Sequence, residues 1–291
     1  MSKRRDIYQE ITDLVIQDLE KGVVPWEKPW TGPDGECRNG ISQNAYSGIN
    51  RLITWLDQRS GRGSKLYFSF KQAKSLGGHV KKGARGIPIV FYKPLKIEEV
   101  NKAGEVDEKT IPMMKYSVVF NLDDIEGLDS VKDIESKIER REISLHEASE
   151  KIISKINPLI KFGGDQACYR PSSDSIHMPD RDRFKDQPSY YSVLFHEIAH
   201  WTGHESRLKR NNKNFFGSYD YAFEELIAEM GAAFISSSVG FKYDAQHAAY
   251  IENWLRILKK DKRMLFKAAA QAQKAADFVL KTNTCSAESA A

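Results

Sequence analysis

The chain has few cysteines and no long apolar run, and each shortage excludes a class of protein. Its three cysteines, Cys37, Cys168 and Cys285, are scattered and odd in number, which fits reduced thiols better than a disulfide framework. None of them forms a CxxC pair, so no cysteine-based metal site is expected. No stretch approaches the roughly twenty apolar residues of a membrane span, and no apolar signal region follows the charged start. The expected protein is soluble, cytoplasmic and free of membrane segments.

Histidine is also scarce, yet two of the seven histidines lie in one HExxH stretch within residues 193–201. Residues four apart on a helix share a face, so His196 and His200 can aim both imidazoles at one Zn²⁺. Glu197 lies beside them, where it can take a proton from a water. The other positions of the stretch are uncharged, as expected of a helix that is buried on most sides. The stretch predicts a metal centre of the zincin type.

A catalytic zinc needs a third protein ligand and leaves its fourth position open. His204 follows the motif closely, but Gly203 disfavours it because glycine commonly ends a helix. A helical run over residues 221–234 is the stronger source, and its small residues allow close packing against the first helix. Glu225 and Glu229 are four apart in this run, so one can bind the metal while the other holds a histidine ring N–H.

This second run resembles the second helix of glutamate-type zincins, in which the first acid of an ExxxD or ExxxE pair is the ligand. The resemblance implies Glu225 as ligand and Glu229 as the group that orients a histidine, with Glu224 or Glu229 as the alternative ligand. Zn²⁺ is the expected metal and Mn²⁺ the alternative. An active centre of this type hydrolyses peptide bonds with Glu197 as general base. Candidates for the oxyanion donor are Tyr219, Tyr221 and His204.

The net charge of +4 conceals a strongly basic block between residues 38 and 96. The block holds twelve Lys or Arg residues and one acid, Asp57, which is a local charge of +11. Aromatic residues are interleaved with these cations, and such rings stack on the bases of a single strand while cations follow its phosphates. The competing interpretation is a small sheet with core rings and solvated lysines, but the charge block as a whole favours nucleic acid. The predicted DNA-contact residues are Trp26, Tyr46, Arg51, Lys71, Lys74, Lys81, Lys82 and Arg85.

Apolar spacing in the front half predicts a helix over residues 6–20 and a second from near Ile49 to before Gly61. Ile87 to Lys93 and Tyr116 to Phe120 are predicted to be paired strands. The segment that joins them, Glu98 to Lys109, is acidic and polar, so an exposed, mobile hairpin is expected there.

The rear half is predicted to be mainly helical. Alternating charges from about Leu128 to Ser154 indicate a solvated linker helix. Residues 152–170 and 175–179 are expected to supply a helix and an edge strand, which in zincins aligns an extended peptide by backbone pairing. Two further helices are predicted, roughly over residues 244–259 and 261–281.

Several short motifs occur together in the front half. Pro25, Trp26 and Trp30 share a loop, and they are followed by NAYSGIN at 44–50, FKQA at 70–73 with Gly77 and Gly78, KG at 82–83 and VFN at 119–121. Taken together they resemble the N-terminal domain of ArdC-type antirestriction proteins, a domain that also occurs in some plasmid primases. HEIAHWTGH and EELIAE at 224–229 are similar to the metallopeptidase domain that follows it in that family.

This resemblance covers nearly the whole chain. It implies an α+β protein with a small α+β single-stranded DNA-binding domain at residues 1–127, a linker at 128–150, and a mainly helical zincin-like metallopeptidase domain with a short edge sheet at 151–291. It further implies a plasmid-borne protein that binds single-stranded DNA without sequence preference and protects incoming DNA from restriction during conjugation.

The expected partners are single-stranded DNA and either a protein substrate or a restriction enzyme, and the expected form is a monomer. The alternative function is a DNA-coating protein whose zincin domain is a catalytically dispensable scaffold. A primase is not expected, because no acidic polymerase-type metal cluster follows.

Overall fold

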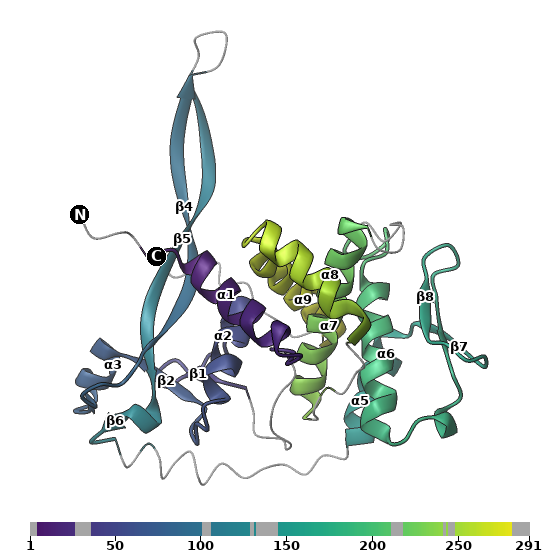
Figure 1. Ribbon diagram of the computed structural model, residues 1–291, viewed down its shortest axis with the longest axis horizontal. Coiled ribbons are helices and arrows are strands. Elements are labelled where there is room, and N and C mark those ends of the chain that lie inside the picture. The colour runs from purple at the N-terminus through teal and green to yellow at the C-terminus, as the bar shows by residue number, and fades with distance from the viewer. Residues whose placement is uncertain are drawn as a thin grey trace. The chain divides into compact units, whose positions relative to one another are not determined.

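The computed structural model spans residues 1–291 and describes residues 5–26, 36–100, 106–128, 131, 145–210, 218–240, 243 and 248–280. The chain forms two compact units, and each is assembled from separated stretches. Unit 1 consists of Met1–Glu36, Ser47–Leu56 and Glu139–Ala291, and unit 2 consists of Cys37–Tyr46 and Asp57–Ile138. Helices and small sheets occur together in this arrangement (Figure 1), which confirms the predicted α+β class with two domains.

These units divide the chain differently from the boundaries expected at residues 127 and 150. Helix α1 (Ile7–Glu20) has the predicted amphipathic pattern, but its buried face belongs to unit 1, where it packs against α8. The Thr12 hydroxyl donates a hydrogen bond to the carbonyl of Lys262 over 2.8 Å. Thr12 and Lys262 are far apart in the chain, so no local sequence pattern predicts their contact. The domain ranges 1–127, 128–150 and 151–291 therefore stay a prediction from sequence.

Unit 1 is built around α7 (Tyr219–Val239), which is buried along nearly all its length and packs against α6 (Gln187–Thr202) and α9 (Met264–Leu280). Small side chains permit this close packing, because a Cβ on Gly231 would lie 3.2 Å from the Cβ of Ala199. Unit 1 also contains α5 (Leu145–Ile156) and α8 (Ala248–Lys260). Helix α2 (Ile49–Gln58) belongs to unit 1 as far as Leu56. Among the described residues, every helix is too short or too polar to serve as a transbilayer segment.

Helix α6 begins and ends where its sequence indicates. Its N-cap is Asp186, whose carboxylate accepts a hydrogen bond from the backbone N–H of Ser189 over 2.8 Å, and Pro188 lies in the first turn. Gly203 is the C-cap. His204 therefore lies beyond the helix and does not continue the face that carries His196 and His200.

The small sheet of unit 1 corrects two expectations for residues 152–179. Helix α5 ends at Ile156, and the next residue, Asn157, has a φ of 47°. Two strands then replace the expected continuation of helix, and the sheet has the order β7 (Leu159–Phe162), β9 (Ser175–Met178), β8 (Cys168–Arg170). Strand β9 is therefore the central strand and not an edge strand, and most of its residues are buried. The edge strand closest to α6 is β8.

The linker helix expected over residues 128–154 falls mainly outside the described residues, since residues 129–130 and 132–144 are not described. Its last part corresponds to α5.

Unit 2 contains a sheet of order β1 (Arg38–Asn39), β2 (Leu66–Ser69), β5 (Val106–Asn121), β4 (Ile87–Val100). Helix α3 (Phe70–Ser75) follows β2 directly, and a capping box formed by Ser69 and Gln72 starts it. A two-stranded sheet joins β3 (His79–Val80) to β6 (Ile125–Glu126), and η1 (Leu122–Asp124) precedes β6. The main core of unit 2 consists of Leu66, Phe68, Ala73, Leu122, Ile125 and Leu128.

Strands β4 and β5 are much longer than the sequence predicts. Their antiparallel pairing runs without interruption from Ile87↔Val119 to Val100↔Val106, and Figure 1 shows the resulting ribbon extending away from the other strands of unit 2. The segment expected to be a hairpin, Glu98 to Lys109, forms the far end of this ribbon, and residues 101–105 lie outside the described residues. Backbone hydrogen bonds pair the two strands, and they do not require the alternating apolar pattern by which a strand is predicted from sequence.

Candidate metal centre and nucleic-acid interface

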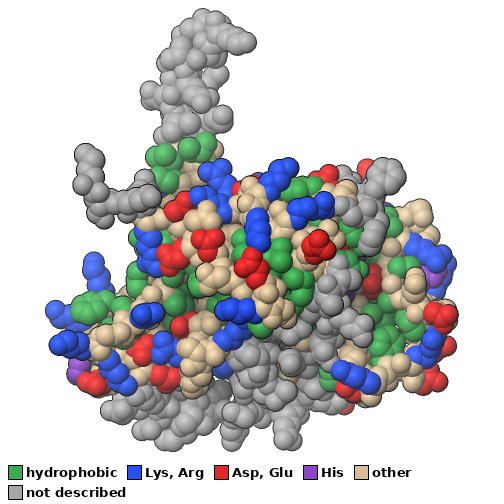
Figure 2. All heavy atoms as spheres, viewed as in Figure 1, with side chains coloured by type: hydrophobic (Ala, Val, Ile, Leu, Met, Phe, Trp, Pro, Cys, Tyr) green, Lys and Arg blue, Asp and Glu red, His purple; other side chains and the backbone are tan. Residues whose placement is uncertain are grey.

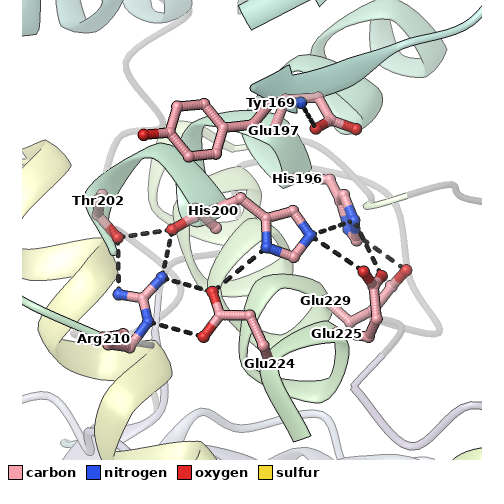
Figure 3. A network of polar contacts seen from close by, with 10 residues as sticks. Tyr169, His196, Glu197, His200, Thr202, Arg210, Glu224, Glu225 and Glu229 are labelled. Atoms are coloured by element: carbon pink, nitrogen blue, oxygen red, sulfur yellow. Dashed lines mark hydrogen bonds and ion pairs between the residues drawn. The ribbon is translucent and has the colours of Figure 1, made fainter. Parts of the chain in front are cut away.

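Helices α6 and α7 bring three metal-ligating side chains together (Figure 3). The Nε2 atoms of His196 and His200 are 3.1 Å apart. The Glu225 carboxylate faces both, with Oε2 3.5 Å from His196 Nε2 and Oε1 3.4 Å from His200 Nε2. The three ligand atoms all lie within 4.8 Å of one another. Two imidazoles and one carboxylate form the ligand set of catalytic zinc sites, so the chain places its three predicted ligands in one cluster.

The polar atoms of this cluster fit a divalent cation. His196 Nδ1 lies 3.4 Å from Glu229 Oε1, and His200 Nδ1 lies 3.3 Å from Glu224 Oε1. An N–H at each Nδ1 leaves a lone pair at each Nε2, and those two lone pairs face one another. Glu225 Oε2 is buried and has no hydrogen-bond donor among the described residues. A cation between these atoms satisfies all three.

The pKa shifts of the cluster residues also favour a bound cation. Burial lowers the pKa of His196 and of His200, but the surrounding glutamates outweigh burial and raise both pKa values above the ordinary range. Burial raises the pKa of Glu225, but the two histidines outweigh it, so the pKa of this carboxyl is lowered. The pocket therefore stabilises positive charge beside an ionised Glu225, which is the condition for holding a metal ion.

Glu224 and Glu229, the two alternative ligands, instead hold the outer nitrogens of the rings. Glu229 Oε2 accepts a hydrogen bond from the Tyr243 hydroxyl over 2.9 Å. Glu224 is bound by the Arg210 guanidinium at 3.0 and 3.1 Å, and this pair is nearly buried. Neither carboxylate belongs to the three-residue cluster. Each ring therefore has its own carboxylate, which fixes its orientation.

Arg210 and Tyr243 are absent from the sequence-based candidates. Arg210 also donates hydrogen bonds to the Ala199 carbonyl at 2.6 Å and to the Thr202 hydroxyl at 2.9 Å. It thereby ties the loop after α6 to both metal-site helices. No spacing rule connects an arginine in a loop with a carboxylate on the following helix, so only the folded chain identifies this link.

The Glu197 carboxylate points toward β8, as Figure 3 shows. Its Oε2 accepts a hydrogen bond from the backbone N–H of Tyr169 over 2.6 Å, and the residue is 7% exposed. A cleft of about 500 Å³ reaches this point. The residues that line it include Val193, His196, Glu197, Glu229, Arg183 and Tyr250. The general-base candidate is therefore buried but borders a space that a substrate can enter.

The three expected oxyanion donors have different surroundings. His204 Nδ1 contacts the Ser206 hydroxyl at 2.8 Å, and the Tyr219 ring lies beneath Lys260 Nζ. Tyr221 interacts electrostatically with the metal-ligand cluster: burial raises the pKa of its hydroxyl, and the charge of Glu225 raises it further. Tyr250, which sequence patterns did not single out, lines the cleft itself, and burial followed by Glu225 raises its pKa.

Both halves of the chain match known protein families. Residues 5–120 match the model of the N-terminal domain of anti-restriction factor ArdC, and residues 147–271 match that of a zincin-like metallopeptidase. Crystal structures of the antirestriction ArdC protein from plasmid R388, metal-free and Mn(II)-bound, are both 38% identical. Their TM-scores are 0.78 and 0.77, and the match covers 95% and 96% of this chain and 97% and 100% of those chains. The chain belongs to the ArdC-type antirestriction family.

Two curated relatives of this ArdC-type chain extend the comparison. The DNA primase TraC of Escherichia coli is 34% identical over 95% of the chain, but the chain spans only 27% of that primase. The uncharacterized protein y4eC of Sinorhizobium fredii (strain NBRC 101917 / NGR234) is 32% identical over 94% of the chain and 91% of that protein.

Two of the predicted DNA contacts of the ArdC-type chain are core residues of unit 1. Trp26 is fully buried and packs edge-on against Trp254, with ring centroids 5.1 Å apart. Arg51 is 5% exposed, pairs with Glu36, and lies 5.0 Å from the centroid of the Phe234 ring. This burial corrects both assignments, because a base cannot stack on Trp26 and a phosphate cannot reach Arg51 in this fold.

Tyr46 belongs to unit 2 and is only partly accessible. Its ring packs edge-on against Tyr67, with centroids 6.1 Å apart, and it borders a small core of Cys37, Tyr67 and Val119. Burial raises the pKa of Tyr46 to about 12. Its main role in the fold is packing.

The other predicted cations of the ArdC-type chain are exposed on unit 2: Lys71, Lys74, Lys81, Lys82 and Arg85. Four large rings are exposed on the same unit: Phe70, Phe91, Tyr92 and Tyr116. Tyr92 pairs with Met114, two residues from Tyr116, so both tyrosines lie on one face of the ribbon. Figure 2 shows Lys and Arg side chains around a hydrophobic patch at the α3 end of unit 2, at the left of that view. These cations and rings define the candidate DNA surface.

Proposed function

We propose that this ArdC-type protein binds single-stranded DNA without sequence preference and protects incoming plasmid DNA from restriction during conjugation, and that its metal centre is a zinc metallopeptidase. The observation that carries the peptidase is the convergence of His196, His200 and Glu225 near Glu197. The proposed place of action is the cytoplasm, and the proposed form is a monomer. The proposed partners are single-stranded DNA and either a protein substrate or a restriction enzyme.

In this proposal His196, His200 and Glu225 hold the metal. The metal is Zn²⁺, with Mn²⁺ as the alternative because the R388 relative has a Mn(II)-bound structure. When bound, zinc supplies a Lewis acid that lowers the pKa of a water towards about 7 and polarises a peptide carbonyl. Glu224 and Glu229 keep the two rings in ligating orientation through their Nδ1 atoms.

Glu197 is the proposed general base. Its carboxylate takes the proton of the attacking water and passes it to the leaving amine of the substrate. Tyr250 is the proposed oxyanion donor, because it lines the cleft beside Glu197 and burial raises its pKa. A tyrosine hydroxyl is protonated at neutral pH, so it can donate a hydrogen bond to the oxyanion.

The DNA-binding half of the proposal rests on the candidate DNA surface. Exposed lysines and arginines neutralise phosphates without reading sequence. Exposed rings such as Tyr92 and Tyr116 offer stacking faces to unpaired bases, which a duplex keeps inside its helix. The surface therefore favours single-stranded over double-stranded DNA.

Two assays on the purified full chain test the proposal. Fluorescence anisotropy with labelled oligothymidine and a duplex of equal length should give tighter binding of the single strand and an affinity that falls steeply with added salt. Labelled casein should be hydrolysed by the zinc-loaded protein and not by Glu197→Ala. Equal affinity for the duplex would contradict the DNA assignment, and unchanged casein cleavage by Glu197→Ala would contradict the catalytic one.

The alternative function is DNA coating with a zincin unit that is a dispensable scaffold. The exposed cations and rings of the candidate DNA surface support this alternative, because they can coat single-stranded DNA without any peptidase activity. Conjugation into a restricting host separates the two functions. If peptide hydrolysis is needed, plasmids encoding Glu197→Ala transfer as poorly as those lacking the protein, whereas coating alone predicts transfer at the wild-type level.

A further inference from the structure

We infer that Arg207, Asp174 and the Tyr169 hydroxyl form a brace that positions the general base, by holding strand β8 against α6 so that the Tyr169 N–H binds Glu197. The inference rests on the proposed peptidase function for its catalytic consequence. None of the three brace residues belongs to the metal cluster, and none was predicted from the sequence. They are positioning residues for Glu197.

The brace begins at Asp174, between β8 and β9, where the chain has a φ of 45°. Asp174 Oδ1 accepts a hydrogen bond from the Tyr169 hydroxyl over 2.9 Å. Its Oδ2 accepts one from Arg207 Nη1 over 2.9 Å. Hydrogen bonding to Arg207, the largest effect, and to Tyr169 lowers the pKa of Asp174 despite partial burial. One carboxylate therefore links the side chain on β8 to the arginine.

Arg207 carries the link to the metal helix. Its Nε donates to the Trp201 carbonyl in the last turn of α6 over 2.6 Å. Its guanidinium carbon lies 3.9 Å from the centroid of the Trp201 ring, a cation–π contact. The guanidinium group thus contacts both the carbonyl and the ring of Trp201 on α6, and it also binds Asp174. A planar fork with this many partners is more rigid than a single ion pair.

The register of β8 explains why this matters for Glu197. Tyr169 lies opposite Ile176 of β9, yet its N–H donates to Glu197. In an antiparallel pair, such a residue directs both its N–H and its C=O away from the partner strand. The Tyr169 backbone therefore lies on the free edge of β8, facing α6. A shift of β8 along or away from α6 changes the 2.6 Å hydrogen bond by which the Tyr169 N–H holds the Glu197 carboxylate.

Tyr169 contributes to this arrangement through both its side chain and its backbone. The Tyr169 hydroxyl is bound by the brace, and the Tyr169 N–H binds the base, so the side chain anchors the backbone that it belongs to. Displacements of about 1 Å in a catalytic group can lower a rate a hundredfold. Loss of the brace should therefore lower kcat, with little effect on metal content because the ligands are untouched.

The first test reads the Tyr169 amide without using activity. The full chain is labelled with ¹⁵N-tyrosine, and Tyr169→Phe assigns the signal by removing it. In the wild type this amide proton should lie downfield and exchange slowly, and Glu197→Ala should move it upfield and speed its exchange. Arg207→Ala and Asp174→Gly should change it in the same direction.

Two matched variants separate the side-chain brace from the local backbone. Asp174→Gly suits the positive φ but removes the carboxylate, whereas Asp174→Asn also tolerates that φ and keeps an acceptor oxygen. The brace predicts that Asp174→Asn retains most of the amide protection and that Asp174→Gly loses it. Arg181→Ala, which breaks the exposed pair with Glu150, serves as a control and should leave the Tyr169 amide unchanged.

The second test is kinetic. With labelled casein and zinc, Arg207→Ala and Tyr169→Phe should lower kcat by about tenfold or more while KM stays within about twofold. Zinc content should remain at the wild-type level. A Tyr169 amide that is unchanged in folded Arg207→Ala and Asp174→Gly overturns the brace. Casein left intact by the wild type counts against the peptidase instead, and the amide measurement still decides the brace.

Discussion

The metal centre of unit 1 and the candidate DNA surface of unit 2 hold their functional side chains in opposite ways. At the metal centre the outer nitrogen of each histidine ring faces its own carboxylate, and Arg210 in turn holds Glu224. On the DNA surface, cations such as Lys71 and Lys82 are exposed on one helix and one turn. A centre that must place atoms to within a fraction of an ångström needs buried, mutually fixed groups. A surface that contacts any sequence needs charge and rings but no fixed geometry.

The contrast predicts that the metal centre depends on single side chains. Glu225→Ala removes one of three ligands and should reduce zinc affinity by more than the roughly 10- to 100-fold that loss of an orienting group costs. Zinc content by mass spectrometry should fall to background, and added zinc should no longer raise the melting temperature, because stabilisation by a ligand requires binding to the folded state.

Glu229→Gln is the matched control for Glu225→Ala, since Glu229 lies outside the three-residue cluster and contacts the outer nitrogen of His196 and the Tyr243 hydroxyl. It should weaken zinc binding while leaving it measurable. Equal loss in both variants would mean that the two carboxylates do not have the separate roles assigned to them.

A second prediction compares two aromatic residues. Trp26→Ala removes a fully buried ring and should lower the free energy of unfolding of unit 1 by about 3–5 kcal/mol, with unchanged affinity for oligothymidine in the fraction that is folded. Tyr92→Ala removes a 49% exposed ring and should change stability by less than about 0.5 kcal/mol while weakening DNA binding by about 1–3 kcal/mol.

Calorimetry and fluorescence anisotropy on the same preparations check this pair of variants. The division between core ring and stacking ring fails if Trp26→Ala weakens DNA binding in folded protein more than Tyr92→Ala does.

The DNA surface should lose affinity in small, similar steps. Replacing Lys71, Lys74, Lys82 and Arg85 one at a time by alanine should weaken binding of all single-stranded sequences equally. Each change should reduce the slope of log affinity against log salt by about 0.7, the value for one phosphate contact on a single strand. Anisotropy titrations over a range of salt concentrations measure this slope. A variant that alters sequence preference instead would show that the surface reads bases.

The smallest effect is expected at Tyr46 and only at high pH. Burial raises the folded pKa of Tyr46 to about 12 from an ordinary value of 10.0. A raised folded pKa means that the stabilisation is complete below pH 10 and is lost as the pH rises through 10 towards 12. Tyr46→Phe should flatten the fall in stability of unit 2 over this range, and denaturant melts at pH 7 and pH 11 detect the difference. Identical pH dependence in the two proteins would remove the packing role of this hydroxyl.

Prediction from sequence succeeded where the relevant geometry is local. The expected helices over residues 6–20 and from Ile49 correspond to α1 and α2, because amphipathic periodicity is a property of one helix. Strands Ile87 to Lys93 and Tyr116 to Phe120 are paired as predicted. The sequence did not reveal that both strands continue without interruption to the expected hairpin at Glu98 to Lys109.

Prediction failed where burial depends on distant residues. Trp26 lies in a segment whose composition is typical of a loop, yet its ring is covered by Trp254 from the other end of the chain. Arg51 lies within the basic block, but Glu36 and Phe234 enclose it. A count of charges and rings cannot distinguish an enclosed side chain from an exposed one.

The sequence by itself determined that His196, Glu197 and His200 lie within one helical stretch and that the region from residue 38 to 96 is strongly basic, because helix periodicity and charge are local properties. Only the tertiary structure decided that Glu225 completes the cluster, that Glu224 and Glu229 each hold a separate ring, and that Tyr169 binds Glu197. These relations depend on how α6, α7 and β8 pack, and packing is set by contacts between residues far apart in the chain.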